Sequence, residues 1–276
     1  MGDNILTMIK VIELPIDKDM GGLTSYVLQL YRMIDKKEFE LTLLSYDDPQ
    51  NFDVNYKVET VSRPYHIIQF YKKMKCLLSE GKDIIHFHQS YVNIIPILIA
   101  KLAGFKTIIL HAHSSSIDDN RRIVRFLKTG LHKVGRFLLP YLVDIYIGCS
   151  TKASEWMFPR KCIDSDSYYL LHNAIDLDLY DRNINLGLEI RQKFNIPKDA
   201  LVVGHIGRFT PVKNHPFIID IFKEVLKQNP NSYLFLLGDG VERHKVESLV
   251  KLAAISDKVI FMGYVNNTVE VMQAID

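Results

Sequence analysis

The sequence predicts an α/β protein with two doubly wound, Rossmann-like domains. Three observations support this prediction. Apolar, β-branched runs of strand length alternate with longer segments of helical period, the region that follows lacks a strand pattern, and the alternation then begins again. We therefore expect an amino-terminal domain over residues 1–172, a crossing segment over 173–200 and a second domain over 201–276.

The first domain follows the spacing of βαβ units. Short apolar runs rich in β-branched residues predict its strands, and apolar residues spaced three and four apart predict its helices. The strands are expected at residues 5–13, 39–46, 56–60, 83–88, 107–112, 143–149 and 166–171. The helices are expected at about 22–35, 66–79, 92–103, 118–139 and 151–157.

The second domain repeats this alternation over a shorter length. We expect strands at 201–207, 233–238 and 258–263, and helices at 214–228 and 241–254. A nucleotide-binding domain of five or six strands needs about 150 residues, since each βαβ unit takes about 30 or more. The second domain is therefore expected to be truncated, ending inside the helix that follows its third strand.

Composition excludes several classes of protein. The chain has 276 residues, of which 47% are hydrophobic and 24% charged, and this balance excludes disordered, collagen-like and coiled-coil chains. A net charge of +2 gives no reason to expect a nucleic-acid partner. Cys76, Cys149 and Cys162 form no C-x-x-C pair, and no signal-peptide pattern is present, so we expect a cytoplasmic setting. The most apolar stretch, residues 94–110, is too short and too often interrupted to span a membrane.

The strongest local signal is the segment HIGRFTPVKNHPF at residues 205–217. A predicted strand ends at Gly207, and Arg208 and Lys213 follow it. Asn214 is expected to cap the next helix, which has a proline in its first turn. Ligands of open α/β sheets bind beyond the carboxyl ends of the strands, where a guanidinium, an ammonium and helix N–H groups together suit a diphosphate. The alternative is a pair of solvated loop cations.

A second candidate is the strand-to-helix turn MGGLTSYVLQL at residues 20–30. Gly21 and Gly22 permit close backbone approach, so the start of the helix can receive a phosphate or a substrate hydroxyl. The segment is not a G-x-G-x-x-G fingerprint. The alternative is therefore a plain turn with no function.

Two H-x-H pairs, His86 with His88 and His111 with His113, lie at the ends of predicted strands. Because residues i and i+2 of a strand point to one face, the imidazoles can converge. With an aspartate at position 118 or 119 they would form the metal site of a hydrolase. The alternative, which we adopt, is a set of histidines that form hydrogen bonds in a polar cleft without a metal.

Residues 118–142 have the pattern of a basic amphipathic helix. The basic face is formed by Arg121, Arg125, Lys128, His132 and Arg136, and the apolar face by Val124, Leu127, Leu131, Val134 and Leu138. Such a helix can dock on anionic lipid headgroups. The alternative is a core helix with a solvated basic face.

Three D-x-D sequences, at residues 17–19, 164–166 and 176–178, have a pattern that can hold a metal on a nucleotide diphosphate. None directly ends a convincing buried strand. We interpret them as turn or capping aspartates.

The order and spacing of these segments resemble the retaining GT-B glycosyltransferases of the large group 1 type, family four, which include bacterial capsular and exopolysaccharide enzymes. The matching segments are GGLTSYVLQL (21–30), DIIHFHQS (83–90), TIILHAHSSS (107–116), IYIGCSTKASEWM (145–157), LHNAIDLDLY (171–180), GRFTPVKN (207–214), LLGDG (236–240) and VIFMGY (259–264). The resemblance implies a GT-B fold and the transfer of a hexose from a nucleotide-diphosphate sugar to a growing polysaccharide or lipid-linked glycan, with retention of configuration.

The resemblance also implies roles for the two loops. Arg208 and Lys213, which follow Gly207, match the pair that holds the donor diphosphate. Gly21 and Gly22 match the glycine loop beside the donor phosphate and the acceptor.

Four further positions match by resemblance. His113 matches the active-site histidine near the transferred sugar. Asn173 matches the first residue of the N-G-x-D stretch at the domain junction, where Ala174 replaces the usual glycine. Gly263 and Tyr264 match the turn near the nucleobase.

The resemblance implies no bound metal and no cofactor, because the nucleotide sugar is a co-substrate. The expected setting is cytoplasmic, with docking of residues 118–142 on the inner face of the cell membrane. The family pattern continues past residue 276 into an E-x7-E motif that this chain lacks. The alternatives are therefore a truncated, non-catalytic binding protein and, from the histidine pairs, a metal-dependent hydrolase.

Overall fold

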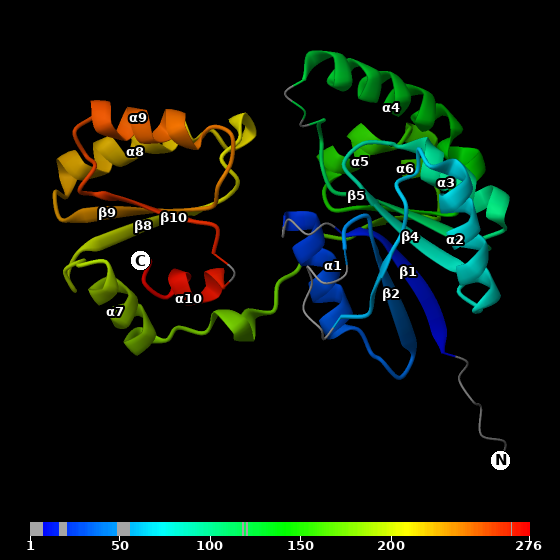
Figure 1. The fold of residues 1–276 in the computed structure, drawn as a ribbon, viewed down its shortest axis with the longest axis horizontal. Helices are drawn as coiled ribbons and strands as arrows, with labels where there is room; N and C mark the ends of the chain where they lie inside the picture. Colours follow the sequence, from blue (N-terminus) through cyan, green and yellow to red (C-terminus); the bar gives the residue numbers. More distant parts are fainter. Residues whose placement is uncertain (1–7, 17–20, 49–55, 118, 120, 266) are drawn as a thin grey trace. The chain divides into compact units, whose positions relative to one another are not determined.

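The computed structural model describes the chain except for residues 1–7, 17–20, 49–55, 118, 120 and 266. The chain divides into two compact units, residues 1–175 and 176–276 (Figure 1). Each unit contains a parallel sheet with helices on both faces, which confirms the predicted α/β class. The division lies inside the segment 173–200 that the sequence assigns to a crossing.

Unit 1 is built on a seven-stranded parallel sheet with the order β3-β2-β1-β4-β5-β6-β7. The strands are β1 (Ile9–Ile16), β2 (Phe39–Ser45), β3 (Val58–Thr60), β4 (Ile84–Gln89), β5 (Thr107–Ala112), β6 (Ile145–Gly148) and β7 (Tyr168–Leu170). The helices are α1 (Gly22–Met33), α2 (Ile67–Ser79), α3 (Ile94–Ala103), α4 (Arg122–Leu142), α5 (Thr151–Met157) and α6 (Arg160–Ile163). The predicted elements are present, and α6 is an addition.

The two faces of this sheet differ in what they bury. On one face, Phe87 and Leu110 belong to a large apolar core with Phe70 of α2 and residues of α3, α4 and α5. Side chains alternate along a strand, so the neighbours of these core residues point to the opposite face. Among the described residues, a small apolar cluster that includes Val27 and Leu28 of α1 lies there, at the end of β1 and β2. This face holds the polar groups described below.

Helix α4 departs from the predicted arrangement of its faces. His132 is buried, its ring stacks on Trp156 at a centroid distance of 4.2 Å, and its Nδ1 accepts a hydrogen bond from the backbone N–H of Val92. Arg136 donates hydrogen bonds of 2.8 Å to the backbone carbonyls of Trp156 and Phe158. The prediction of a solvated basic face is therefore wrong for His132 and Arg136.

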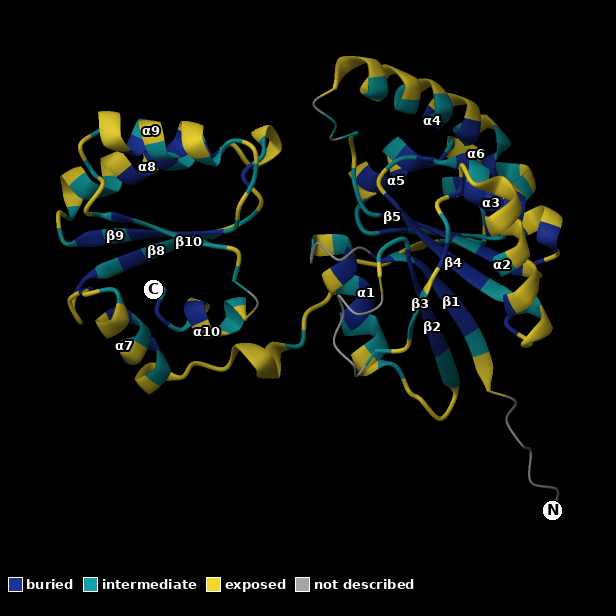
Figure 2. Ribbon diagram, in the orientation of Figure 1, coloured by how far each residue is buried: buried dark blue, intermediate teal, exposed yellow. Residues whose placement is uncertain are grey.

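The outer face of α4 is exposed (Figure 2), and part of it is apolar. Six of its apolar side chains are more than half exposed, namely Ile123, Phe126, Leu127, Val134, Phe137 and Tyr141. The predicted apolar face is thus wrong for Leu127 and Val134, whereas Leu131 and Leu138 pack on the core. Gly135 explains why α4 is rotated about its axis relative to the prediction. A Cβ added at Gly135 would overlap Val92, so only a residue without a side chain fits on the side of the helix that faces the core.

Unit 2 is built on a three-stranded parallel sheet with the order β10-β9-β8. Its elements are β8 (Leu201–Ile206), β9 (Ser232–Leu237), β10 (Val259–Gly263), α7 (Ile184–Lys193), α8 (His215–Gln228), α9 (Arg243–Leu252), α10 (Thr268–Met272) and the 3-10 helices η2 (Leu177–Tyr180) and η3 (Pro211–Lys213). Helices α8 and α9 cover one face of the sheet, and α7 and α10 lie at the other (Figure 1).

Helix α7, which the sequence does not predict, lies inside the segment assigned to the crossing. Its buried Arg191 donates hydrogen bonds to the carbonyls of Lys198, Ala200 and Ala274. These bonds connect α7 to the start of β8 and to the residues after α10. Residues 184–200 therefore belong to unit 2 rather than to a connection between the units, and Ile196 and Ala200 lie in its apolar core.

Candidate functional site

A histidine cluster lies under α1 on the face of unit 1 that the large apolar core leaves uncovered. We use this name for Glu13 of β1, His86 and His88 of β4, His111 of β5 and His113, which follows β5. The sheet register sets Glu13 beside His86 and His88 beside His111. The predicted convergence of the two H-x-H pairs is therefore confirmed.

Hydrogen bonds connect three members of the histidine cluster in a row. The carboxylate of Glu13, which is 2% exposed, accepts from His88 Nε2 through its Oε2 at 2.6 Å. The same oxygen lies 3.0 Å from His86 Nδ1. His88 Nδ1 lies 2.9 Å from His113 Nε2. A buried carboxylate is therefore linked through one imidazole to the histidine that the sequence assigns to the active site.

The protonation of the histidine cluster follows from burial and from these contacts. Burial alone would raise the pKa of Glu13, but the charge of His86 and hydrogen bonds from His86 and His88 hold that pKa well below its usual range. Burial, with the charge of His86, lowers the pKa of His88 to about 4 despite the opposing effect of Glu13. Burial, with the neighbouring histidines, lowers the pKa of His113 to about 2. At neutral pH, Glu13 is therefore a carboxylate and His88 and His113 are neutral.

The first turns of α1 lie beside the histidine cluster. The Tyr26 ring lies 5.2 Å from the His113 ring and 5.3 Å from the His111 ring, centroid to centroid. Gly21 precedes the helix in an extended conformation, and α1 begins at Gly22. A Cβ added to Gly22 would meet no described atom within 4 Å. Among the described residues, no side chain or backbone atom fills the space beside Gly22, as the phosphate hypothesis requires.

The histidine cluster is also the place where a metal could bind. One ligand atom from each of His86, His88 and His111 can be chosen so that the three lie within 4.8 Å of one another. Of the two aspartates predicted to complete the site, Asp119 pairs instead with Arg121 and Lys128, and residue 118 lies outside the described residues. The nitrogens of His86 and His88 that face Glu13 are occupied by that carboxylate.

The carboxyl edge of the unit 2 sheet brings the predicted donor residues together. Arg208 is exposed on the loop that follows Gly207. Lys213 bends back over this loop, since a Cβ added to Gly207 would lie 3.4 Å from Lys213 Cδ. Gly238, with φ of +130°, packs so closely that its own Cβ would overlap the Gly207 carbonyl oxygen. The backbone N–H of Gly238 donates to the Gly263 carbonyl oxygen at 2.7 Å.

Other predicted residues stand in different settings. Tyr264 follows Gly263 and is 59% exposed, and Asn173 is exposed near the end of unit 1. Helix α8 begins at His215 with a proline in its first turn, as predicted, but Asn214 has a left-handed backbone with φ of 48° and forms no side-chain capping bond. The capping prediction is wrong because this backbone turns the Asn214 side chain out of capping geometry.

The aspartates of the D-x-D sequences form different contacts. Asp176 accepts a hydrogen bond from the Asp178 backbone N–H at the start of η2, which confirms the capping interpretation there. Asp164 pairs with Arg160 at the end of α6. Residues 17–19 lie outside the described residues.

Sequence reasoning did not identify the roles of three polar residues near these edges, of which two are buried and one, His205, is half-buried. Glu13 is one, because an isolated acidic residue in an apolar strand carries no motif. His205 and His215 of unit 2 are the others, with rings 4.9 Å apart and His215 stacked on Phe209 at 4.0 Å. Burial lowers the pKa of both histidines. The adjacent Lys213 lowers that of His205 further.

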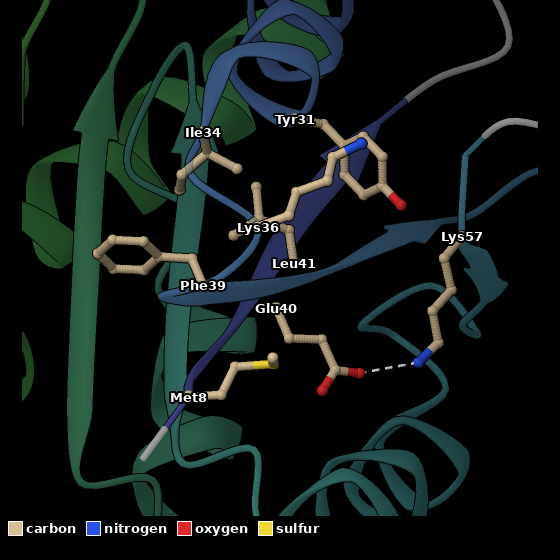
Figure 3. A pocket seen from close by; sticks show the side chains of 8 residues that line it. All are labelled: Met8, Tyr31, Ile34, Lys36, Phe39, Glu40, Leu41 and Lys57. Carbon is tan, nitrogen blue, oxygen red and sulfur yellow. Dashed lines mark hydrogen bonds and ion pairs between the residues drawn. The ribbon is translucent and has the colours of Figure 1, made fainter. Parts of the chain in front are cut away.

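A shallow pocket of about 170 Å³ lies at the opposite end of the unit 1 strands (Figure 3). It is lined by Met8, Tyr31, Ile34, Lys36, Phe39, Glu40, Leu41 and Lys57. Its one ionic contact among these residues joins Lys57 to Glu40 at 3.0 Å. Because ligands of parallel α/β sheets bind at the carboxyl ends of strands, we assign this pocket no part in the site.

Comparison with known families decides the class of protein. The profile described as Glycosyltransferase Family 4 matches residues 20–179, and the profile described as Glycosyl transferases group 1 matches residues 188–276. The chain belongs to glycosyltransferase family 4. The resemblance inferred from the sequence is thus confirmed at the level of the family.

Two relatives that match nearly the whole chain are distant from it in sequence. The chain is 24% identical over 285 residues to a Bacillus subtilis (strain 168) protein named as the glycosyltransferase EpsF, and the match covers 97% of this chain and 71% of the relative. It is 20% identical over 289 residues to UDP-Gal:alpha-D-GlcNAc-diphosphoundecaprenol alpha-1,3-galactosyltransferase of Escherichia coli, with 97% of this chain and 72% of the relative covered.

Solved structures show the same fold. The crystal structure of Anabaena HepE in complex with UDP and glucose matches with a TM-score of 0.74 at 15% identity, over 98% of this chain and 73% of that one. The structure of WaaG, a glycosyltransferase involved in lipopolysaccharide biosynthesis, matches with a TM-score of 0.67 at 15% identity, over 97% of this chain and 73% of that one. The family 4 chain therefore has the GT-B fold, as predicted. The roles of Arg208, Lys213, His113 and the other predicted site residues remain predictions.

Proposed function

We propose that this glycosyltransferase transfers a hexose from a nucleotide-diphosphate sugar to a growing glycan with retention of configuration. The observation that carries the proposal is the convergence of Gly207, Arg208 and Lys213 at the carboxyl edge of unit 2. Two cations beside a glycine loop and the start of α8 suit a diphosphate. The complex of HepE with UDP and glucose and the UDP-Gal donor of the E. coli relative support a nucleotide-sugar donor.

In the proposed reaction, the bond between the anomeric carbon and the diphosphate breaks while the acceptor oxygen bonds to that carbon. The leaving diphosphate gains negative charge, and Arg208 and Lys213 stabilise it. The acceptor hydroxyl loses a proton, which the leaving phosphate takes. Gly263 and Tyr264 complete the donor site of unit 2 in this proposal, and His113 and Asn173 of unit 1 keep the roles that the sequence predicts for them.

We propose that the reaction needs no bound metal and no cofactor. Two cationic side chains can neutralise the leaving group, and the nitrogens of His86 and His88 that face Glu13 are already occupied. Protein that has been treated with a chelator and then freed of it should therefore transfer sugar at the same rate as untreated protein. Loss of transfer that added zinc or manganese restores would overturn the proposal of a metal-free reaction.

The acceptor is proposed to be lipid-linked, and the protein to act at the inner face of the cell membrane from the cytoplasm. Within the described residues, no helix has both the length and the apolar character to cross a bilayer. Helix α4 instead presents apolar side chains beside exposed arginines at 121, 122 and 125. Aromatic and basic residues on one surface are typical of helices that lie in the membrane interface. The lipid diphosphate acceptor of the E. coli relative agrees with this location.

Transfer is tested with the purified chain, a panel of nucleotide-diphosphate sugars and bacterial lipid extract. We expect one donor to yield a new glycolipid and free nucleoside diphosphate, with the anomeric configuration of the donor kept in the product. A product of inverted configuration would overturn the retaining mechanism. Failure of every nucleotide to bind would overturn the donor assignment.

Membrane docking is tested by flotation with vesicles of phosphatidylglycerol and phosphatidylcholine. The double variant Phe126→Ser, Phe137→Ser should lose binding to these vesicles. The matched control is Leu252→Ser, because Leu252 is 84% exposed on α9 and should not affect flotation. Equal flotation of the wild type and the double variant would remove α4 from the proposal.

A further inference from the structure

We propose that Glu13 and His88 are positioning residues that hold His113 in one tautomer, with the proton on Nε2 and a lone pair on Nδ1. That lone pair would accept a hydrogen bond from a sugar hydroxyl. The identity of this hydrogen-bond donor rests on the proposed function, whereas the tautomer rests on the geometry of unit 1 alone.

The first step concerns the proton between Glu13 and His88. An ionised carboxylate only accepts hydrogen bonds. Glu13 Oε2 lies 2.6 Å from His88 Nε2, and both side chains are buried. His88 must therefore carry a proton on Nε2 and donate it to Glu13.

The second step concerns the other nitrogen of His88. A second proton, on Nδ1, would place a full charge on a side chain with no exposed surface. His86 already shares the single negative charge of Glu13, which further disfavours a charged His88. His88 Nδ1 is therefore unprotonated and has a lone pair that can accept a hydrogen bond. It lies 2.9 Å from His113 Nε2, so that nitrogen must carry the proton that joins the two rings.

The third step concerns the far side of His113. A neutral imidazole has one N–H, and His113 uses it on His88, so Nδ1 has a lone pair. No hydrogen bond from a described residue to this nitrogen is found. His113 is partly exposed just past the end of β5, beside Tyr26 of α1. Its Nδ1 is therefore placed to accept, and not to donate, a hydrogen bond from a ligand.

The tautomer matters because it decides which ligand group His113 can hold. A lone pair on Nδ1 accepts from a hydroxyl, whereas a proton there would need an acceptor and would repel the hydrogen of an N–H or O–H group. An isolated imidazole populates both tautomers, so an imposed tautomer removes the free-energy cost of choosing one when the ligand binds.

The direct test is long-range ¹H–¹⁵N NMR of wild-type protein labelled at histidine, at neutral pH and without ligand. The His113 signals are assigned by their loss in His113→Gln. We expect His113 to have its proton on Nε2 and His88 to be neutral. A His113 proton on Nδ1, a rapid mixture of tautomers or a doubly protonated His88 would overturn the proposal, and this test needs no altered core residue.

A pair of variants tests whether Glu13 sets the tautomer of His113 through His88, a connection that we call the relay. In Glu13→Gln, the side-chain amide can donate to His88 Nε2, which moves the His88 proton to Nδ1 and the His113 proton away from Nε2. We expect the His113 nitrogen shifts to move toward the other tautomer, and the kcat of transfer to fall roughly ten- to a hundredfold with a smaller change in KM, as for loss of a supporting partner. The matched control is His86→Gln, which still offers Glu13 a donor but has no bond to His113.

The outcomes separate the two proposals. Unchanged His113 shifts in Glu13→Gln, or equal shifts in His86→Gln, would overturn the relay. If the wild type has the expected tautomer but no donor nucleotide binds, the relay stands and the proposed function fails. If transfer occurs with His113 in the opposite tautomer, the function stands and the relay fails.

Discussion

Replacing Gly22 by alanine separates a role in ligand binding from a role in folding. Gly22 is the first residue of α1, and an added Cβ would meet no described atom within 4 Å. Alanine is favoured over glycine in a helix by up to about 1 kcal/mol, so the free energy of unfolding should stay equal or rise by that amount. The melting temperature should then rise by about 0–4 °C.

The same Cβ would occupy the space beside the first turn of α1, where the sequence predicts that a phosphate or a substrate hydroxyl binds. A bound substrate displaced by about 1 Å loses roughly a hundredfold in rate, so kcat/KM for transfer should fall by about that factor. The assay compares Gly22→Ala with wild type at several donor concentrations, with the acceptor in detergent so that membrane docking does not contribute.

The matched control is Gly130→Ala. Gly130 lies in α4, and a Cβ added there also meets no described atom within 4 Å. Both variants should be as stable as the wild type or more so, but only Gly22→Ala should lose activity. Equal kcat/KM in the two variants would refute a ligand at the start of α1, and a lower melting temperature for Gly22→Ala would refute the open space there.

Three further predictions concern binding, packing and pH. Arg208→Ala should weaken nucleoside-diphosphate binding roughly 10- to 100-fold in calorimetry, since hydrogen bonds to charged groups contribute about 1.5–3 kcal/mol, whereas the exposed Lys251→Ala should bind as wild type does. Gly238→Ala should lower the free energy of unfolding by about 1–3 kcal/mol, because φ is +130° and the Cβ would overlap Gly207; urea unfolding equal to the wild type would contradict this geometry. Burial, with Arg136 nearby, lowers the pKa of His132 from 6.5 to about 4 in the folded protein. Between pH 6.5 and 4 the unfolded chain therefore binds a proton at His132 that the folded protein does not, and the free energy of unfolding should fall as the pH drops through this range. His132→Asn, which keeps a hydrogen-bond acceptor, should flatten that pH dependence, and an unchanged slope would exclude His132 as its source.

The alternation of strands and helices was predictable because it depends on local periodicity. The convergence of His86 with His88 and of His111 with His113 followed from the same alternation of side chains along a strand. The loop from Gly207 to Lys213 was found because its charged residues directly follow a strand.

The features that sequence reasoning missed depend on contacts between distant segments. Glu13 becomes a partner of His88 only because β1 lies beside β4. The sequence of a single parallel strand does not determine which strands lie beside it. Helical period divided α4 into two faces but did not say which faces inward. Gly135 and the stacking of His132 on Trp156 decide that, and both depend on packing against segments far from α4 in the sequence.

The proposed function requires that unit 2 bind the diphosphate of a nucleotide-sugar donor. Isothermal titration calorimetry of the purified chain with UDP, GDP, ADP and dTDP tests it without any knowledge of the acceptor. We predict saturable binding of at least one of the four, weakened when Arg208 and Lys213 are both replaced by alanine. No binding of any of these nucleotides, or equal binding by the double variant, would contradict a diphosphate site at Arg208 and Lys213.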